Sequence, residues 1–140
     1  TSLIARMIAE GICVAGDFDI EVIDIEQVSV GELEQKVMES EAIIVGSPTI
    51  NQNILLPVYR LFSVINPLRD KGKIAGAFGS YGWSGESRGL IRSNLENLKL
   101  RFVGDGVFVK FSPDAADQEA ARRYGELIGM ELREYEESQD

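Results

Sequence analysis

Two short segments rich in glycine and hydroxyl side chains carry the residues best suited to hold a ligand. SPTINQN (47–53) follows the apolar run AIIVG, and GSYGWSGES (79–87) follows KIAGAF. Hydroxyls and free backbone groups in such turns can bind polar ligand atoms. The glycines of the second segment let the backbone approach a flat ligand, on which Tyr81 or Trp83 can stack. A planar, partly polar heterocycle fits this combination better than a sugar or a peptide.

Packing alone could also explain each turn. Ser-Pro-Thr after a buried strand is often only a turn, and a lone tryptophan in a glycine-rich loop is often a half-buried anchor. The two turns, however, follow successive buried strands and should lie at the same end of one sheet. Ligands of open parallel sheets bind outside the carboxyl ends of the strands, so the pair of turns together favours a ligand site.

The composition excludes several classes of function. The formal net charge of −9 argues against nucleic acid as a partner and favours a basic or metal-bearing one. The absence of histidine removes histidine triads and most zinc or iron sites. No stretch approaches the roughly 18 consecutive apolar residues of a membrane span, and the start does not resemble a signal peptide. Cys13 is the only cysteine, so no disulfide framework exists and a cytoplasmic location is expected.

Hydrophobic periodicity predicts a regular alternation of helices and strands. Helices are expected over 1–15, 29–39, from Pro57 to Asn66-Pro67, from about Glu86, and from Asp114 or Asp117. Strands are expected over 20–25, 42–47, 73–80 and within 101–111, the last interrupted by Gly104 and Gly106. In the last helix, the residues expected to face the sheet are Ala116, Ala120, Tyr124, Leu127 and Leu132.

This alternation predicts a single α/β domain over 1–140, in which a doubly wound parallel sheet has helices on both faces. The tail of about 135–140 is expected to be frayed. A doubly wound domain normally opens with a strand, whereas this sequence opens with a helix. The first strand and the turn after it therefore look as if they are missing.

The quoted turns and their spacing resemble one known family. VGSPTINQNILLP and GAFGSYGWSGES look like the two loops that border the isoalloxazine ring in the flavodoxin-like domain of flavodiiron proteins. TSLIARMIAEGI resembles the end of that family's phosphate loop running into its first helix. The similarity extends to about Glu134. It implies a flavodoxin-like, three-layer α/β/α fold and a bound FMN.

The resemblance also assigns cofactor-binding residues by position. One side and edge of the ring would be bordered by Ser47, Pro48, Thr49, Ile50 and Asn51. The other side would be bordered by Gly79, Ser80, Tyr81, Gly82, Trp83, Ser84 and Gly85. Thr1 would be the remaining member of the phosphate loop, at the N-terminus of the first helix. No catalytic or metal-binding residue is expected.

The resemblance implies electron transfer, in which FMN does the chemistry and the protein sets its position and potential. In the family, electrons pass from a rubredoxin-like donor through FMN to a diiron centre that reduces oxygen or nitric oxide. That centre lies in a metallo-β-lactamase-like domain built on His, Asp and Glu, so this histidine-free chain would supply only the flavin half. The resemblance further implies a homo-oligomer.

Three alternatives remain open at this point. The chain could be a free-standing flavodoxin-type electron carrier or quinone reductase, although the GSYGWSGES loop argues against it. It could be a receiver-like signalling domain, but such a domain needs a phosphorylatable Asp where AIIVGSPT has no acid. Finally, it could be an interaction domain without flavin.

Overall fold

The computed structural model describes residues 2–46, 56–81, 87–104, 106–110 and 114–139. The helices are α1 (Ser2–Ala15), η1 (Ile25–Gln27, a 3₁₀ turn), α2 (Val30–Glu39), α3 (Leu56–Val64), α4 (Pro67–Asp70), α5 (Ser87–Asn97) and α6 (Ala115–Gln139). The strands are β1 (Ala42–Gly46), β2 (Ile74–Tyr81), β3 (Arg101–Phe102) and β4 (Val107–Lys110). Among these residues, no helix is both long and apolar enough to cross a bilayer.

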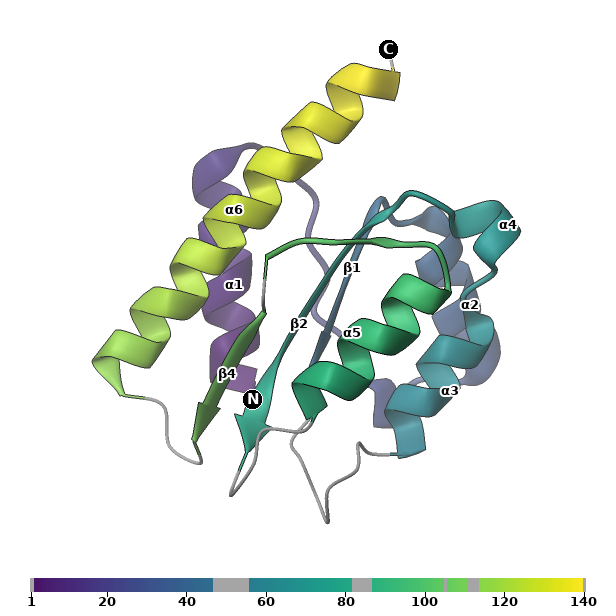
Figure 1. The fold of residues 1–140 in the computed structure, drawn as a ribbon, viewed down its shortest axis with the longest axis horizontal. Coiled ribbons are helices and arrows are strands. Elements are labelled where there is room, and N and C mark those ends of the chain that lie inside the picture. The colour runs from purple at the N-terminus through teal and green to yellow at the C-terminus, as the bar shows by residue number, and fades with distance from the viewer. Residues whose placement is uncertain (1, 47–55, 82–86, 105, 111–113, 140) are drawn as a thin grey trace.

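The described strands form one parallel sheet with β2 at its centre. β1 pairs with one edge of β2 along its whole length, from Ala42↔Ile74 to Gly46↔Phe78. β3 and β4 both pair with the other edge of β2. Parallel strands joined by helices are what the sequence pattern predicted, and the arrangement is visible in Figure 1.

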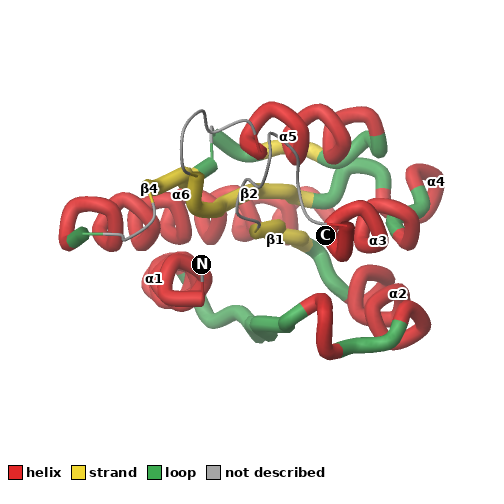
Figure 2. The backbone as a smooth tube through the Cα atoms, turned by 90° about the horizontal axis from the view of Figure 1, so that it is seen from below, coloured by secondary structure: helices red, strands yellow, loops and turns green. Residues whose placement is uncertain are grey.

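Helices cover both faces of this sheet (Figure 2), and each face has its own apolar core. The first cluster packs α2, α3 and α5 against Ile43 and Val45 of β1 and Ala75 and Ala77 of β2. The second packs α1 and α6 against Ile74 and the buried valines of β4. The predicted three-layer α/β/α architecture is therefore present.

The interruption predicted at Gly104 and Gly106 is present between β3 and β4. β3 ends at Ala75↔Phe102 and β4 begins at Phe78↔Val107, so four residues separate these two strands in the sequence where β2 has two. Gly104 and Gly106 lie in this interval, with φ angles of +61° and +78°. Glycine adopts this left-handed conformation without the steric penalty that other residues incur.

The strand expected over 20–25 is wrong. Residues 17–24 have no regular secondary structure, and Ile25 already belongs to η1. Burial alternates only in part: Phe18 and Ile20 pack against the core while Asp19 and Glu21 are exposed, but Val22 is 60% exposed. A strand also needs a neighbour for its backbone hydrogen bonds, and none of the described strands pairs with this segment.

The inner face of α6 differs from the predicted one. Ala116 and Ala120 are exposed and Leu127 is 40% exposed, whereas Tyr124 and Leu132 are buried as expected. The residues that complete the buried stripe are Ala121 and Ile128. The helix continues through the tail as far as Gln139. Fraying of that tail stays a prediction.

Glycines let α6 lie directly on α1, as Figure 1 shows for the two neighbouring helices. A Cβ atom on Gly125 would lie 2.0 Å from the carbonyl oxygen of Ile8. A Cβ atom on Gly11 would lie 1.9 Å from the carbonyl oxygen of Arg122. Backbone meets backbone at both positions, so neither site leaves space for a methyl group.

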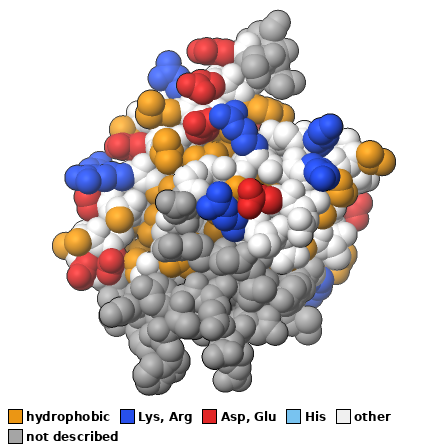
Figure 3. Space-filling view, in the orientation of Figure 1, with side chains coloured by type: hydrophobic (Ala, Val, Ile, Leu, Met, Phe, Trp, Pro, Cys, Tyr) orange, Lys and Arg blue, Asp and Glu red, His pale blue; other side chains and the backbone are white. Residues whose placement is uncertain are grey.

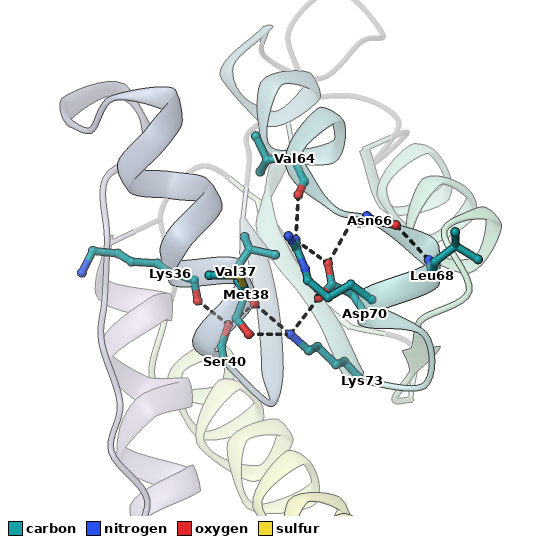
Figure 4. A network of polar contacts seen from close by, with 10 residues as sticks. Lys36, Val37, Met38, Ser40, Val64, Asn66, Leu68, Asp70 and Lys73 are labelled. Carbon is teal, nitrogen blue, oxygen red and sulfur yellow. Dashed lines mark hydrogen bonds and ion pairs between the residues drawn. The ribbon is translucent and has the colours of Figure 1, made fainter.

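A cluster of charged side chains lies at the amino ends of β1 and β2 (Figure 4), with the buried carboxylate of Asp70 at its centre. Asp70 accepts hydrogen bonds from Arg69 Nε (3.0 Å) and Nη2 (2.9 Å) and from the Asn66 amide (2.9 Å). It also forms an ion pair with Lys73 Nζ at 2.8 Å. Asn66-Pro67, expected only to end a helix, also starts α4, because Asn66 Oδ1 accepts from the Leu68 amide.

The two cations of this cluster also bind the carboxyl ends of helices. Lys73 Nζ donates to the carbonyl oxygens of Val37 (2.9 Å) and Met38 (3.2 Å) at the end of α2. Arg69 Nη2 donates to the carbonyl oxygen of Val64, the last residue of α3, at 3.1 Å. Cations at these ends satisfy carbonyls that lack intrahelical partners and favour the helix dipole. The cluster therefore ties two helices to the start of β2.

Burial by itself raises the pKa of Asp70, but hydrogen bonds from Arg69, Lys73 and the Asn66 amide outweigh it and lower the pKa from 3.8 to about 2. A carboxyl group whose pKa is lower in the folded state stabilises the fold above its ordinary pKa. That stabilisation is lost as the pH falls from about 4 toward 2.

Replacing Gly125 with alanine should lower the free energy of unfolding by about 3 kcal/mol or more, because the added methyl group collides with the Ile8 carbonyl. Gly31→Ala in α2 is the matched control, since nothing lies within 4 Å of its Cβ position. The control should raise the free energy of unfolding by roughly 0.5 kcal/mol through helix propensity. Urea unfolding monitored by circular dichroism measures both. Equal stabilities for the two variants would contradict the direct backbone contact of α1 and α6.

The stability of the protein should decrease between pH 5 and pH 2, with about 2 kcal/mol of the loss due to Asp70. Asp70→Asn should be less stable at pH 6 and lose less on acidification. Glu96→Gln, which removes an exposed carboxylate paired with Arg92, should keep the acid sensitivity of the parent. Urea unfolding across this pH range tests the role of Asp70. If Asp70→Asn loses as much stability on acidification as the parent protein, this role of Asp70 is refuted.

Candidate functional site

The carboxyl ends of the central strands lie together at one edge of the sheet. β1 ends at Gly46 beside Phe78, and β2 continues to Tyr81, which lies beside Lys110 of β4. Figure 1 shows that α1 begins at this same edge and that α3 and α5 also start there. The segments that follow β1 and β2 therefore leave the sheet at the edge where α1, α3 and α5 begin.

Only some of the predicted site residues lie within the described part of the chain. Gly79, Ser80 and Tyr81 form the last three residues of β2, and Gly79 is buried. The others lie outside the described residues: Thr1, Ser47, Pro48, Thr49, Ile50, Asn51, Gly82, Trp83, Ser84 and Gly85. Their described neighbours Ser2, Gly46 and Tyr81 all lie at the same edge of the sheet. The individual roles of these residues stay predictions.

The helices that begin at this edge are suited to a negatively charged group. The first turn of a helix has amide groups without intrahelical acceptors and carries the positive end of the helix dipole. The chain has 23 acidic residues, yet none is in the first turn of α1, α3 or α5. α2 and α6 also start toward the carboxyl ends of the strands, but they carry Glu32 and Asp117 in their first turns. The starts of α1, α3 and α5 are therefore the ones suited to an anionic ligand such as the phosphate of FMN.

The described residues at this edge offer little for hydrolytic or phosphotransfer chemistry. β1 ends in Val45-Gly46, so it has no carboxylate in the position that a receiver domain needs. Among residues 2–46, 56–81, 87–104, 106–110 and 114–139, no group of three or more His, Cys, Asp or Glu side chains could hold a metal ion.

Sequence reasoning missed one aromatic side chain at this edge. The ring of Phe78 lies against Gly46, where a Cβ atom would be 2.3 Å from both Cε2 and Cζ of the ring. The missed signal is the glycine itself, because glycine at the end of a buried strand often marks the close approach of another group.

Known proteins of two kinds are similar to this chain. The flavo-diiron protein FprA2 of Clostridium acetobutylicum is 39% identical over 127 residues, which are 90% of this chain and 32% of the relative. The structure of rubredoxin oxygen:oxidoreductase from Desulfovibrio gigas superposes with a TM-score of 0.88 at 32% identity, over 96% of this chain and 33% of that one. The chain thus spans about a third of the length of these relatives.

A second kind of similar protein is a flavodoxin of nearly the same length. The structure of a flavodoxin from the domain Archaea matches with a TM-score of 0.78 at 33% identity, covering 95% of this chain and 90% of that one. The sequence model of the flavodoxin family, whose members bind FMN, matches residues 1–125. The flavodoxin-like fold, the likeness to flavodiiron proteins and FMN as the cofactor of the family are confirmed: this chain belongs to the flavodoxin family.

Proposed function

We propose that this chain is an FMN-binding electron-transfer domain. The single observation that best supports this is that β1 and β2 end, and α1 begins, at the same edge of the sheet. Both predicted loops and the predicted phosphate-binding N-terminus adjoin these strand and helix ends in the sequence. Bound there, FMN supplies the chemistry of accepting and donating electrons. The protein contributes the position of the cofactor and the polarity around it.

The binding roles follow from the chemistry of each segment. The N-terminus of α1, with Thr1, would hold the phosphate through amides and a hydroxyl. Residues 47–51 and 79–85 would border the ring, with Trp83 or Tyr81 beside it. The net charge of −9 disfavours additional negative charge on the cofactor and should lower its reduction potential. Screening limits this effect to charges within about 8 Å of the ring.

The partner of this domain would be a diiron domain of the metallo-β-lactamase type. The chain spans about a third of its flavodiiron relatives, so those proteins have room for at least one more domain. One relative is named rubredoxin oxygen:oxidoreductase, which supports a rubredoxin-like donor and oxygen as the terminal acceptor. Nitric oxide is the alternative acceptor. A homo-oligomer would let the flavin of one subunit serve the iron site of another.

The second candidate function is that of a free-standing electron carrier. The archaeal flavodoxin supports it, because that protein matches this chain over 90% of its own length. Both functions require FMN but differ in the polypeptide that carries the domain. Nucleic acid is an unsuitable partner for either. On the face shown in Figure 3, Lys and Arg side chains of the described residues are interspersed with Asp and Glu.

The purified protein should quench the fluorescence of added FMN and bind it more tightly than riboflavin, which lacks the phosphate. Trp83→Ala should weaken FMN binding by about tenfold or more, because aromatic contact with the ring is lost. Phe102→Leu is the matched control, since Phe102 pairs with Ala75 in the amino-terminal half of β2 and should not affect binding. Failure of the parent protein to bind FMN would rule out the proposed function.

The diiron-partner proposal has its own test. After chemical reduction of the FMN-loaded protein under anaerobic conditions, a separately purified diiron domain should accelerate reoxidation of the flavin by nitric oxide. The same domain stripped of iron should not. Equal rates with the loaded and stripped domains would favour the free-standing carrier.

A further inference from the structure

Phe78 lies on the face of the sheet that α1 and α6 cover. Alternate residues of a strand share a face, so Phe78 points to the same side as Ile74 and Gly76. Ile74 belongs to the core beneath α1 and α6, and Phe78 packs against that core. Ile74 is completely buried, whereas Phe78 is only partly buried. The ring therefore packs against the core and keeps part of its surface accessible.

Gly46 determines where the ring of Phe78 lies. The two residues are partners in the ladder, and the ring extends across the end of β1. A Cβ atom on Gly46 would lie 2.3 Å from Cε2 and Cζ and 2.8 Å from Cδ2. Gly46 is not among the described glycines with positive φ, so the requirement for glycine here is steric. The ring can occupy this position only because residue 46 has no side chain.

Phe78 lies beside Gly46, the last residue of β1, at the edge where α1 begins. An aromatic ring at such a position offers a flat apolar surface beside the positive end of a helix. An exposed aromatic surface gains free energy when a ligand excludes water from it. FMN combines an anionic phosphate with a large apolar ring, and therefore complements both features.

We propose that Phe78, held in place by Gly46, is a positioning residue that forms an apolar floor of the FMN site. This inference rests on the proposed FMN-binding function. Phe78 lies outside the two loops that carry the predicted ring contacts, so it adds a described side chain to the site. Its role is to exclude water and limit the positions that the cofactor can occupy, without a part in the electron transfer itself.

Phe78→Leu tests the floor, and Ile128→Val is the matched control in the same apolar core, on α6. Phe78→Leu should raise the dissociation constants of FMN and riboflavin by the same factor, about tenfold, because an apolar floor does not contact the phosphate. Ile128→Val should lower the thermal stability of the flavin-free protein but leave both constants unchanged. Fluorescence quenching and thermal unfolding provide the two readouts.

Gly46→Ala provides an independent test that keeps the phenylalanine, because the added methyl group must displace the ring. It should weaken flavin binding, and adding Phe78→Leu to it should cause no further loss, since the two residues act together. This variant also decides the question if Phe78→Leu does not fold.

The outcomes separate this inference from the proposed function. If the parent protein binds FMN and both variants bind it as tightly while losing thermal stability, Phe78 is only a core residue and the floor is refuted. If the parent protein binds no FMN, the proposed function fails and the floor fails with it. A loss of flavin affinity in both variants, with none in Ile128→Val, supports the floor.

Discussion

The in-register parallel pairing of β1 with β2 is the constraint on which the rest of this structure depends. It extends from Ala42↔Ile74 to Gly46↔Phe78 and places the ends of both strands at one edge. A slip of one residue would turn Ile43 and Val45 away from α2, α3 and α5 toward the opposite face, because side chains of a strand alternate between faces. The same slip would separate Phe78 from Gly46. Burial therefore fixes the register, and the register fixes the geometry of the candidate site.

The Asp70 cluster and the candidate ligand site lie at opposite edges of the sheet. At the amino ends, the Asp70 cluster joins the ends of α2 and α3 to β2 and satisfies its buried charges with hydrogen bonds. On one face, Gly11 and Gly125 allow α1 to pack directly on α6 and so hold its N-terminus in place. At the carboxyl edge, the first turns of α1, α3 and α5 contain no acidic residue. This division fits the location of ligand sites in open parallel sheets.

Much of the local structure could be predicted from the sequence. Ile4, Ile8 and Ile12 recur every four residues and are buried in α1, and Ser29 caps α2 by accepting from the Glu32 amide at 3.2 Å. The glycines at 104 and 106 interrupt the last strand as predicted. The two turns that are predicted to bind a ligand could be assigned to one edge because successive parallel strands must end on the same side. Their detailed contacts lie outside the described residues.

The sequence by itself determined which segments are helical or extended and which residue types could bind a ligand, because periodicity and capping act within a few residues. Only the tertiary structure decided what each segment packs against. Residues 20–25 alternate like a strand but have no strand partner among the described residues, and α6 turns Ala121 rather than Ala116 inward because α1 lies there. The contact of Phe78 with Gly46 depends on strand register, which is a property of two segments and cannot be read from either one alone.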